Sequence, residues 1–374
     1  MSAATGRGRA ERGARAMKAF VTVQHPAHVH FFKNVIRELR RHGHDVRVYV
    51  RAKDVAVELL RNYGIDHTVL AGASASFGSL ALRQLRFEYA LARQARRLRP
   101  DVITGIGGLA AAHAATVADA KSVVFTDSEL SSNWLMVPFA DVICTPKRFE
   151  MNFGAKQHRY DGFHELAYLH PNYFTPDPDV LREAGVDPDE QFFVVRFSDM
   201  QAHHDVFHDG FSASGKRRLL TFLRSHGRVF VANEGDADHY SEYAVPVPPH
   251  QFHHLLAHAT LVVSDSSTMA TEAGILGTPA IRVNSFAGET DMSNFAELGG
   301  RYGLVFSTPD EREALEEIRG LLSDPVTTDS WRRNRERLLA DKIDVTRFAT
   351  EVLTAVGGAG GEMPAESEGV SRNA

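Results

Sequence analysis

Small hydroxylated side chains follow an apolar run in the second half of the chain, in a pattern that suits phosphate chemistry. The run ends at residue 263, and a helical pattern then opens with Ser266, Ser267 and Thr268. Unsatisfied amides at a helix N-terminus attract anions, and small side chains let a diphosphate approach them. Glu272, about one turn further along, is placed to accept hydrogen bonds from ribose hydroxyls. The pattern predicts a nucleotide-diphosphate site, and its alternative is an ordinary serine-capped helix with Glu272 on a solvated face.

A second polar concentration starts at Arg196, at the end of an earlier apolar run. A guanidinium in that place can donate paired hydrogen bonds to phosphate oxygens. It is followed by His203, His204, Asp205, His208 and Asp209. Because the chain's 19 histidines are scattered throughout, a solvated loop is the first interpretation of this cluster. Substrate contact is the second and metal ligation the third, so no metal site is expected.

The first apolar run of the chain is followed by His25 and His28. Histidine exchanges protons near neutral pH, so either ring is a candidate base, with helix capping as the alternative. Asp127 and Glu129 follow a later apolar run and are further candidates for a base, with helix N-capping as their alternative. Between these groups, Gly107 and Gly108 belong to a glycine-rich turn that permits close approach of a ligand. This turn does not follow the G-x-G-x-x-G pattern, so an NAD site is not favoured.

The stretch from Asp265 to Pro279 resembles the nucleotide-sugar motif of the GT-B superfamily, which includes UDP-N-acetylglucosamine 2-epimerases and the lipid-II-forming N-acetylglucosaminyltransferase. The epimerase pattern reads Asp-Ser-Gly-Gly-x-x-Glu-Glu-Ala and then Leu-Gly-x-Pro. This chain has Asp-Ser-Ser-Thr-Met-Ala-Thr-Glu-Ala and then Leu-Gly-Thr-Pro. The paired glycines are thus replaced by Ser267 and Thr268, and the first glutamate by Thr271.

The resemblance implies that Ser266, Ser267 and Thr268 face the diphosphate and that Glu272 contacts the ribose. Arg196 would then stabilise the leaving diphosphate.

The resemblance also implies roles around the sugar. Superfamily members use the loop containing Glu289 and Asp291 beside the sugar, and they commonly carry a glycine-rich loop or a histidine on the acceptor side. The epimerases place a catalytic aspartate at about Gly107 and Gly108, where this chain has only glycine, and Asp127 roughly matches their next carboxylate. This difference counts against an epimerase mechanism.

The overall layout, from about residue 17 to residue 325, is similar to the uncharacterised archaeal domain-of-unknown-function family 354, placed in the same superfamily. Such a likeness implies a fold more than an activity.

Alternating apolar runs and helical patterns predict two consecutive α/β halves. Strands are expected at residues 19–23, 46–50, 67–70, 102–104, 122–125 and 142–144, and then at 192–196, 229–231, 261–264, 280–283 and 303–306. Helices are expected at residues 30–41, 55–63, 80–98 and 110–118, and then at 215–226, 251–258, 268–276, 294–298 and 311–322. The fold class expected is therefore α/β, with two facing Rossmann-like doubly wound parallel-sheet domains and a cleft between them.

The chain has 374 residues, enough for two domains. We expect a flexible extension at residues 1–16, an acceptor-side domain at 17–165, a nucleotide-sugar domain at 166–330, a helix at 331–356 and a disordered tail at 357–374. Residues 149–188, which are rich in proline and aromatic side chains, are the expected connection between the domains. Either Met1 or Met17 is compatible with the start of the protein.

Composition narrows the class of protein further. The formal net charge of −5 argues against a nucleic-acid binder. The apolar runs are too short for a spanning helix, residues 1–16 lack the apolar core of a secretory signal, and Cys144 is the single cysteine. The expected location is therefore the cytoplasm. A basic and aromatic stretch at residues 83–99 leaves peripheral membrane contact open, with a solvated helix face as its first interpretation.

The function expected is that of a GT-B-like glycosyltransferase that uses a nucleotide-diphosphate sugar, UDP-linked, without a metal. The nucleotide sugar is a substrate, so no cofactor is expected, and the acceptor stays unknown. The alternatives are a non-hydrolysing UDP-N-acetylglucosamine 2-epimerase-like enzyme and a catalytically idle nucleotide-sugar binding module. A homodimer is left open.

Overall fold

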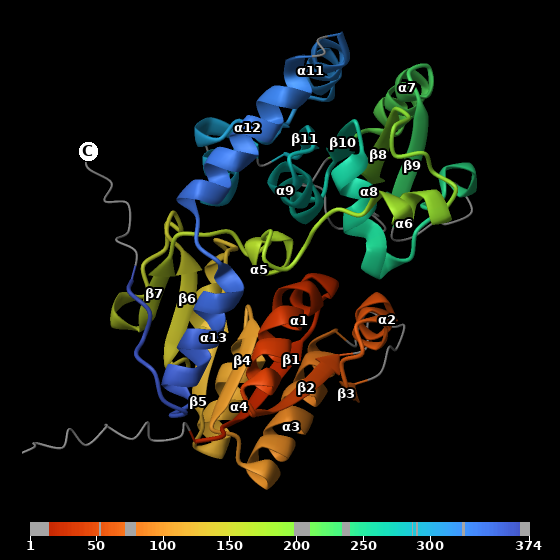
Figure 1. The fold of residues 1–374 in the computed structure, drawn as a ribbon. Coiled ribbons are helices and arrows are strands. Elements are labelled where there is room, and N and C mark those ends of the chain that lie inside the picture. The colour runs from red at the N-terminus through yellow and green to blue at the C-terminus, as the bar shows by residue number, and fades with distance from the viewer. Residues whose placement is uncertain are drawn as a thin grey trace, which may run out of the picture.

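The computed structural model describes residues 15–51, 54–71, 80–197, 210–233, 240–285, 287–288, 291–323 and 326–366. The chain forms two parallel β-sheets, one from each half, with helices packed on them (Figure 1). The predicted class of two Rossmann-like parallel-sheet domains is confirmed.

The first sheet has seven strands in the order β3-β2-β1-β4-β5-β6-β7, all paired in parallel. Its strands are β1 (Lys18–Val23), β2 (Asp45–Arg51), β3 (His67–Ala71), β4 (Val102–Ile106), β5 (Lys121–Phe125), β6 (Val142–Pro146) and β7 (Gln157–Tyr160). The elements between them are α1 (Pro26–Arg41), α2 (Asp54–Asn62), α3 (Leu80–Leu98), α4 (Leu109–Ala118), η2 (Ser131–Leu135) and η3 (Gly154–Lys156). Strand β7 lies within the expected connection, so the first domain extends further into that stretch than its composition indicates.

The second sheet has five parallel strands in the order β12-β11-β10-β8-β9. Its strands are β8 (Phe192–Phe197), β9 (Arg228–Asn233), β10 (Leu261–Ser264), β11 (Ala280–Val283) and β12 (Phe306–Thr308). Its helical elements are α6 (Pro178–Glu183), α7 (Ala213–Arg224), η4 (Ser241–Tyr243), η5 (Pro249–Gln251), α8 (Phe252–His258), α9 (Ser267–Leu276), α10 (Ser293–Ala296), η6 (Glu297–Arg301) and α11 (Glu311–Ser323). The strand expected at residues 303–306 starts only at Phe306, because a glycine turn precedes it.

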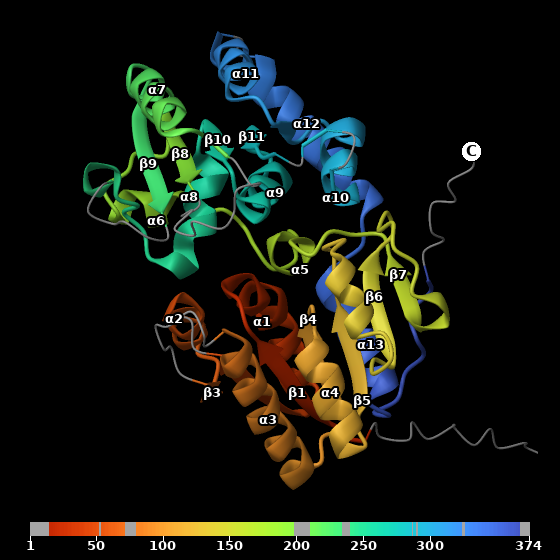
Figure 2. The ribbon, with the colours of Figure 1, turned by 180° about the vertical axis from the view of Figure 1, so that it is seen from behind.

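Three helices connect the two halves. Helix α5 (Leu166–Leu169) lies between the sheets, α12 (Val326–Asp341) packs on α9, and α13 (Val345–Val356) returns to pack on α1, α5 and β5 (Figures 1 and 2). The helix expected at residues 331–356 is thus two helices, and the second crosses back to the first domain. One buried apolar cluster contains both Val21 of β1 and Val262 of β10, so the core is continuous across the junction.

The segment after α13 begins as folded chain. The amide of Ala359 donates to the carbonyl of Thr354, and Ala359 is buried. The expectation of disorder from Gly357 onward therefore does not hold for residues 357–359. Among the helices that the structure describes, none is both long and apolar enough to cross a membrane.

A buried ammonium group joins the two halves between α12 and α13. The Lys342 side chain is 1% exposed, and its Nζ donates to Asp161 Oδ1 at 2.5 Å and to Glu297 Oε1 at 2.7 Å. Asp161 follows β7 of the first domain and Glu297 begins η6 of the second. The ammonium therefore links carboxylates of both domains at a site shielded from water.

We predict that Lys342→Met destabilises the protein by about 3 kcal/mol, because it removes the buried cation between Asp161 and Glu297. The variant leaves these carboxylates only more exposed partners, Lys147 for Asp161 and Arg148 and Arg301 for Glu297. Urea denaturation of the wild type and the variant measures the change. The matched control is Arg347→Met, which removes the exposed Arg347–Glu351 pair and should leave the midpoint unchanged. Equal midpoints for Lys342→Met and the wild type would contradict the proposed contribution of the Lys342 ion pairs to stability.

Candidate functional site

Helix α9 begins immediately after the central strand β10, at the carboxyl edge of the second sheet. The Ser266 amide donates to Ser264 Oγ at 2.8 Å, and this bond shapes the turn between strand and helix. Ser266 is the N-cap residue, but its side chain makes no capping hydrogen bond. The ordinary serine cap is therefore not formed, and the first-turn amides are not covered by a capping hydroxyl.

A buried arginine on β11 lies beneath this helix start. Arg282 is 1% exposed, and its Nη1 donates to Ser267 Oγ at 3.3 Å. Its guanidinium also forms a close ion pair with Asp291 and lies 3.6 Å from the ring centroid of Phe295. Burial lowers the pKa of Arg282 while Asp291 acts in the opposite direction, and a guanidinium stays charged in proteins. A fixed positive charge therefore contacts one of the predicted phosphate-binding hydroxyls.

Glu272 lies further along α9 and is buried at the junction of the two domains. Its Oε1 accepts hydrogen bonds from the Tyr168 hydroxyl at 2.7 Å and from His253 Nε2 at 3.0 Å. Burial acts to raise the pKa of Glu272, but the His253 ring and the bond from Tyr168 outweigh it and hold that pKa below its usual value. Arg196 on β8 contributes in the same direction. The carboxylate is thus ionised, and the alternative of a solvated face is wrong.

Two residues of α1 complete a cluster around Glu272. The His30 ring lies edge-on to His253, with centroids 4.7 Å apart, and 5.3 Å from the ring of Tyr168. Burial lowers the pKa of His30 well below its usual value, and His253 and Lys33 reinforce the effect. Burial likewise lowers the pKa of Lys33 to about 8, with Glu272 opposing it. We call His30, Lys33, Tyr63, Tyr168, His253 and Glu272 the Glu272 cluster.

Asp127 follows β5 and pairs with a buried histidine. Its Oδ1 lies 3.3 Å from His164 Nδ1, and the other ring nitrogen of His164, Nε2, is buried without a hydrogen-bond partner in the part of the chain that the structure describes. Burial lowers the pKa of His164, and Asp127 opposes the shift. The adjacent Glu165 is also buried, and burial together with Asp127 and Glu272 raises its pKa well above the usual value. A carboxyl group with a raised pKa thus lies next to a histidine with a lowered pKa, and Asp127 contacts that histidine.

The side chains of the other candidate bases form hydrogen bonds that cap a helix or join the domains. His25 caps α1, with its Nδ1 accepting from the Ala27 amide at 3.2 Å, and His28 Nδ1 accepts from the Gln24 amide at 3.4 Å. Glu129 joins the domains, because it accepts bonds from the Ser293 amide at 3.0 Å and hydroxyl at 2.7 Å. Asp291 lies in the ion pair with Arg282, so its contact with a sugar stays a prediction. Glu289 and residues 203–209 are outside the described residues.

The glycine-rich turn has a packing explanation. Gly107 has a φ of +58°, and a side chain on Gly108 would come 3.1 Å from Val124 and 3.2 Å from the Gly105 carbonyl. The positive φ of Gly107 and the close contacts at Gly108 favour glycine where α4 starts, so these residues need no ligand to explain them.

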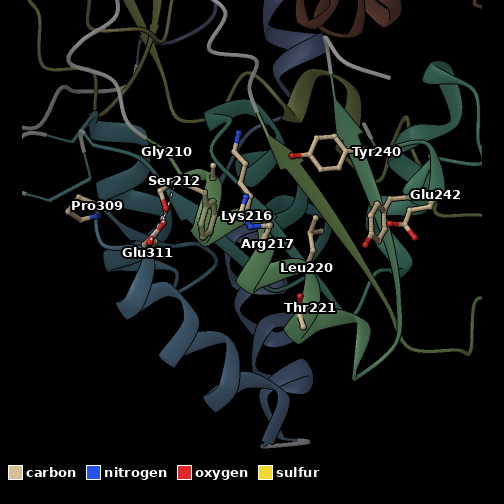
Figure 3. Close-up of a pocket in the computed structure, with 13 residues that line it drawn as sticks. Gly210, Ser212, Lys216, Arg217, Leu220, Thr221, Tyr240, Glu242, Pro309 and Glu311 are labelled. Atoms are coloured by element: carbon tan, nitrogen blue, oxygen red, sulfur yellow. Dashed lines mark hydrogen bonds between the residues drawn. The ribbon is translucent and has the colours of Figure 1, made fainter. Parts of the chain in front are cut away.

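A separate hollow lies on the second domain. It has a volume of about 890 Å³ and lies beside α7. Its lining includes Lys216 and Arg217 from that helix, Tyr240 from the segment after β9 and Glu311 at the start of α11 (Figure 3). Among the described residues, its lining does not include Glu272. The hollow is thus distinct from the Glu272 cluster.

The two parallel sheets, linked through α5 and with the C-terminal helix α13 packed back on the first domain, define the GT-B class of α/β proteins. Within that class, residues 17–291 match the family model described as "Protein of unknown function (DUF354)", and the chain belongs to this family. No curated protein matches the sequence significantly.

Solved structures share the fold at low identity. The S. aureus MnaA–UDP co-structure has a TM-score of 0.69 and 11% identity, covering 94% of this chain and all of that one. The glycosyltransferase SnogD from Streptomyces nogalater has a TM-score of 0.60 and 15% identity, covering 91% of this chain and all of that one. The calicheamicin glycosyltransferase CalG4 has a TM-score of 0.55 and 18% identity, covering 92% and 99%. At such identities the likeness concerns the fold alone.

Acidification should destabilise the protein through its buried neutral histidines. The folded-state pKa of His30 is lowered, so the unfolded chain binds more protons below its usual pKa of about 6.5. The stabilisation from His30 is therefore complete above that pH and decreases as the pH falls below it. We predict that the unfolding free energy of the wild type falls from about pH 7 to about pH 5, and that His30→Gln reduces this slope by up to about 1.4 kcal/mol per pH unit.

Urea midpoints measured at several pH values check this slope. The same substitution at the exposed His226 serves as the control and should keep the wild-type slope. A His30→Gln variant with the wild-type slope would contradict the assignment of His30 as a buried neutral histidine.

Proposed function

We propose that this protein is a GT-B-like enzyme that acts on a nucleotide-diphosphate sugar, and specifically a glycosyltransferase. The observation that carries the proposal is the buried, ionised carboxylate of Glu272, on a helix that starts with uncapped amides and hydroxyl groups above a buried arginine. A helix start and a fixed cation attract a diphosphate, while a carboxylate suits a ribose diol.

The diphosphate would bind at the first turn of α9. The amides there and the hydroxyls of Ser266, Ser267 and Thr268 are donors of the right size for phosphate oxygens. Arg282 fixes the orientation of the Ser267 hydroxyl through its 3.3 Å hydrogen bond. Arg196, near the end of β8, pairs with Ser264 of β10 and adds a second positive charge near Glu272. These fixed charges would stabilise the leaving diphosphate without reorganisation during transfer.

The ribose would bind at Glu272. Both hydrogen bonds that the structure gives this carboxylate within the described residues end on Oε1. Oε2 would accept a ribose hydroxyl, while Tyr168 and His253 hold the carboxylate in place. The buried setting strengthens this bond because few water molecules compete for the oxygen.

A first-domain residue would take the proton from the acceptor hydroxyl. Asp127 lies on Nδ1 of His164, which orients the ring and directs Nε2 away from the carboxylate. A neutral histidine held in this way is a suitable general base. His25 and His28 stay candidates, but their capping bonds hold a ring nitrogen of each at the start of α1.

An epimerase-like reaction is the second candidate. The carboxylate expected near Gly107 and Gly108 is absent from the sequence, but Glu165 brings another carboxyl group within electrostatic range of both Asp127 and Glu272. The pKa of Glu165 is raised and that of Glu272 is lowered. A protonated acid and an ionised base of this kind suit proton transfer on a sugar. Turnover of a nucleotide sugar without an added acceptor would favour this reaction. Binding without turnover under any condition would favour an idle binding module.

We predict that UDP or a UDP-sugar raises the thermal stability of the wild type, by roughly 2.7 kcal/mol at one hundred times its dissociation constant. Glu272→Gln should weaken binding by roughly 10- to 100-fold, because a hydrogen bond to a charged group contributes about 1.5–3 kcal/mol. Thermal-shift titrations with UDP, UDP-N-acetylglucosamine and NAD measure both effects. Glu336→Gln, at an exposed position on α12, is the control and should bind like the wild type. No response to any nucleotide would contradict the proposal.

We predict that His164→Ala lowers the rate of UDP release from UDP-N-acetylglucosamine by roughly 10²- to 10⁴-fold, which is the usual contribution of a general base. The thermal shift produced by UDP should be unchanged, because His164 lies on the acceptor side. His25→Ala is the matched control and should reduce the rate little. A loss of rate in His25→Ala with normal turnover in His164→Ala would assign the base to His25 instead.

A further inference from the structure

Exposed apolar side chains are unevenly distributed over the described residues. Twelve large apolar residues are exposed, and eight of them lie on one part of the first domain: three on α3, one on α4 and four between residues 130 and 139. On α3, the exposed fractions are 46% for Leu82, 62% for Leu85 and 73% for Tyr89. Single exposed apolar residues are normal, but a concentration of this kind marks an interaction surface.

These elements form one continuous face. Helices α3 and α4 pack together, and Figure 2 shows them side by side over the first sheet. Arg96 Nε on α3 donates to the carbonyl of Val117 on α4. The His113 ring of α4 lies 4.4 Å from the ring of Phe139, which joins α4 to the 130–139 segment. We call this surface the α3–α4–η2 face.

The segment between residues 130 and 139 carries the strongest apolar exposure of this face. Leu130 and Leu135 are each 61% exposed, Trp134 is 52% exposed and Phe139 is 41% exposed. Only part of the Trp134 ring packs inward, edge-on to Phe153. Aromatic rings with one exposed side are typical of surfaces that enter the interfacial region of a bilayer.

The same face carries excess positive charge. Arg86, Arg93 and Arg97 are exposed and lie on the side of α3 that also carries Leu82, Leu85 and Tyr89, since these positions follow at steps of three or four residues. The only acid of this helix, Glu88, pairs with His113 of α4 at 3.0 Å and is 17% exposed. The whole chain has a net charge of −5, so this face is basic on an acidic protein.

We propose that the α3–α4–η2 face docks the protein on the surface of a bilayer that contains anionic lipids. Arginine side chains would contact lipid phosphates, while Leu85, Tyr89, Leu130 and Trp134 would enter the headgroup region. This combination of guanidinium groups with exposed leucine and tryptophan is typical of helices that lie in the membrane interface. A nucleic acid would neutralise the arginines but would leave the exposed leucines in contact with water, whereas the headgroup region of an anionic bilayer accommodates both. The proposal concerns a surface away from the Glu272 cluster and does not depend on the proposed enzymatic function.

Vesicle flotation with the full-length protein tests the docking. We expect binding to vesicles of phosphatidylglycerol and phosphatidylcholine, weaker binding in high salt and no binding to phosphatidylcholine alone. Arg93→Glu/Arg97→Glu should lower the partition coefficient at least about 25-fold, because removal of each basic residue costs roughly five-fold and the added carboxylates repel anionic lipid. The matched control Arg332→Glu/Arg333→Glu makes the same change at exposed positions on α12 and should bind like the wild type.

The apolar contribution is tested separately. Leu85→Gln/Trp134→Gln should abolish flotation, whereas Val55→Gln/Met363→Gln, at exposed apolar residues outside this face, should not change it. The chain has two tryptophans, and Trp331→Phe leaves Trp134 as the reporter of the interface. Its fluorescence should shift to shorter wavelength when anionic vesicles are added. Unchanged melting temperatures of the variants establish that they are folded.

Three results would overturn the proposal. The first is the absence of flotation with anionic vesicles at low salt. The second is binding that the control variants lose as strongly as the α3 and η2 variants, which would place the contact elsewhere. The third is binding that depends on Arg93 and Arg97 but not on Leu85 and Trp134, with no shift in Trp134 fluorescence. That result would identify electrostatic adsorption to the charged vesicle surface, without entry of the apolar side chains into the headgroup region.

Discussion

The burial of an ionised carboxylate, Glu272, between two domains is the constraint on which the rest of this structure depends. Transfer of a charge out of water is costly unless hydrogen bonds replace the lost hydration. Here Tyr168 on α5 and His253 on α8 supply these bonds. The short helix α5 is therefore held between the two sheets, and α13 packs against it from the C-terminal end of the chain. The segment that connects the two domains therefore includes α5, whose Tyr168 donates a hydrogen bond to Glu272.

Burial at the domain junction also shifts the pKa values of the charged side chains around Glu272. His30 and Lys33 face Glu272 from α1. The lowered pKa of His30 favours its neutral ring, whereas Lys33, with a pKa of about 8, keeps its ammonium charge at neutral pH. Arg282 keeps its charge because Asp291 compensates for its burial. A fixed positive charge thus lies at the start of α9, where a diphosphate would bind.

The sequence predicts the local features of this site well. The start of α9 and the place of Glu272 on it follow from an apolar run, small polar residues and a helical period, all of which lie within a dozen residues. The two α/β series follow from the same kind of local pattern. Strand β7 is not predicted because its residues, Gln157–Tyr160, are mostly polar and pair at the edge of the sheet.

Pairing across long distances along the chain is what the sequence does not reveal. Tyr168 and Glu272 are 104 residues apart, and nothing local to either residue indicates the other. His164 lies in a stretch whose composition indicates a linker, so its pairing with Asp127 depends on tertiary structure. Arg282 offers a weak signal, as a charged residue within the buried strand AIRV. At Gly107 and Gly108 a local pattern that resembles a ligand loop has a structural explanation instead, namely the positive φ of Gly107 and the packing of Gly108 against Val124.

A crystal structure of the protein with UDP tests the central claim most directly. The account predicts that the diphosphate lies over the first-turn amides of α9 and that a ribose hydroxyl bonds to Glu272. UDP bound in the hollow beside α7, with the Glu272 cluster unchanged, would contradict it.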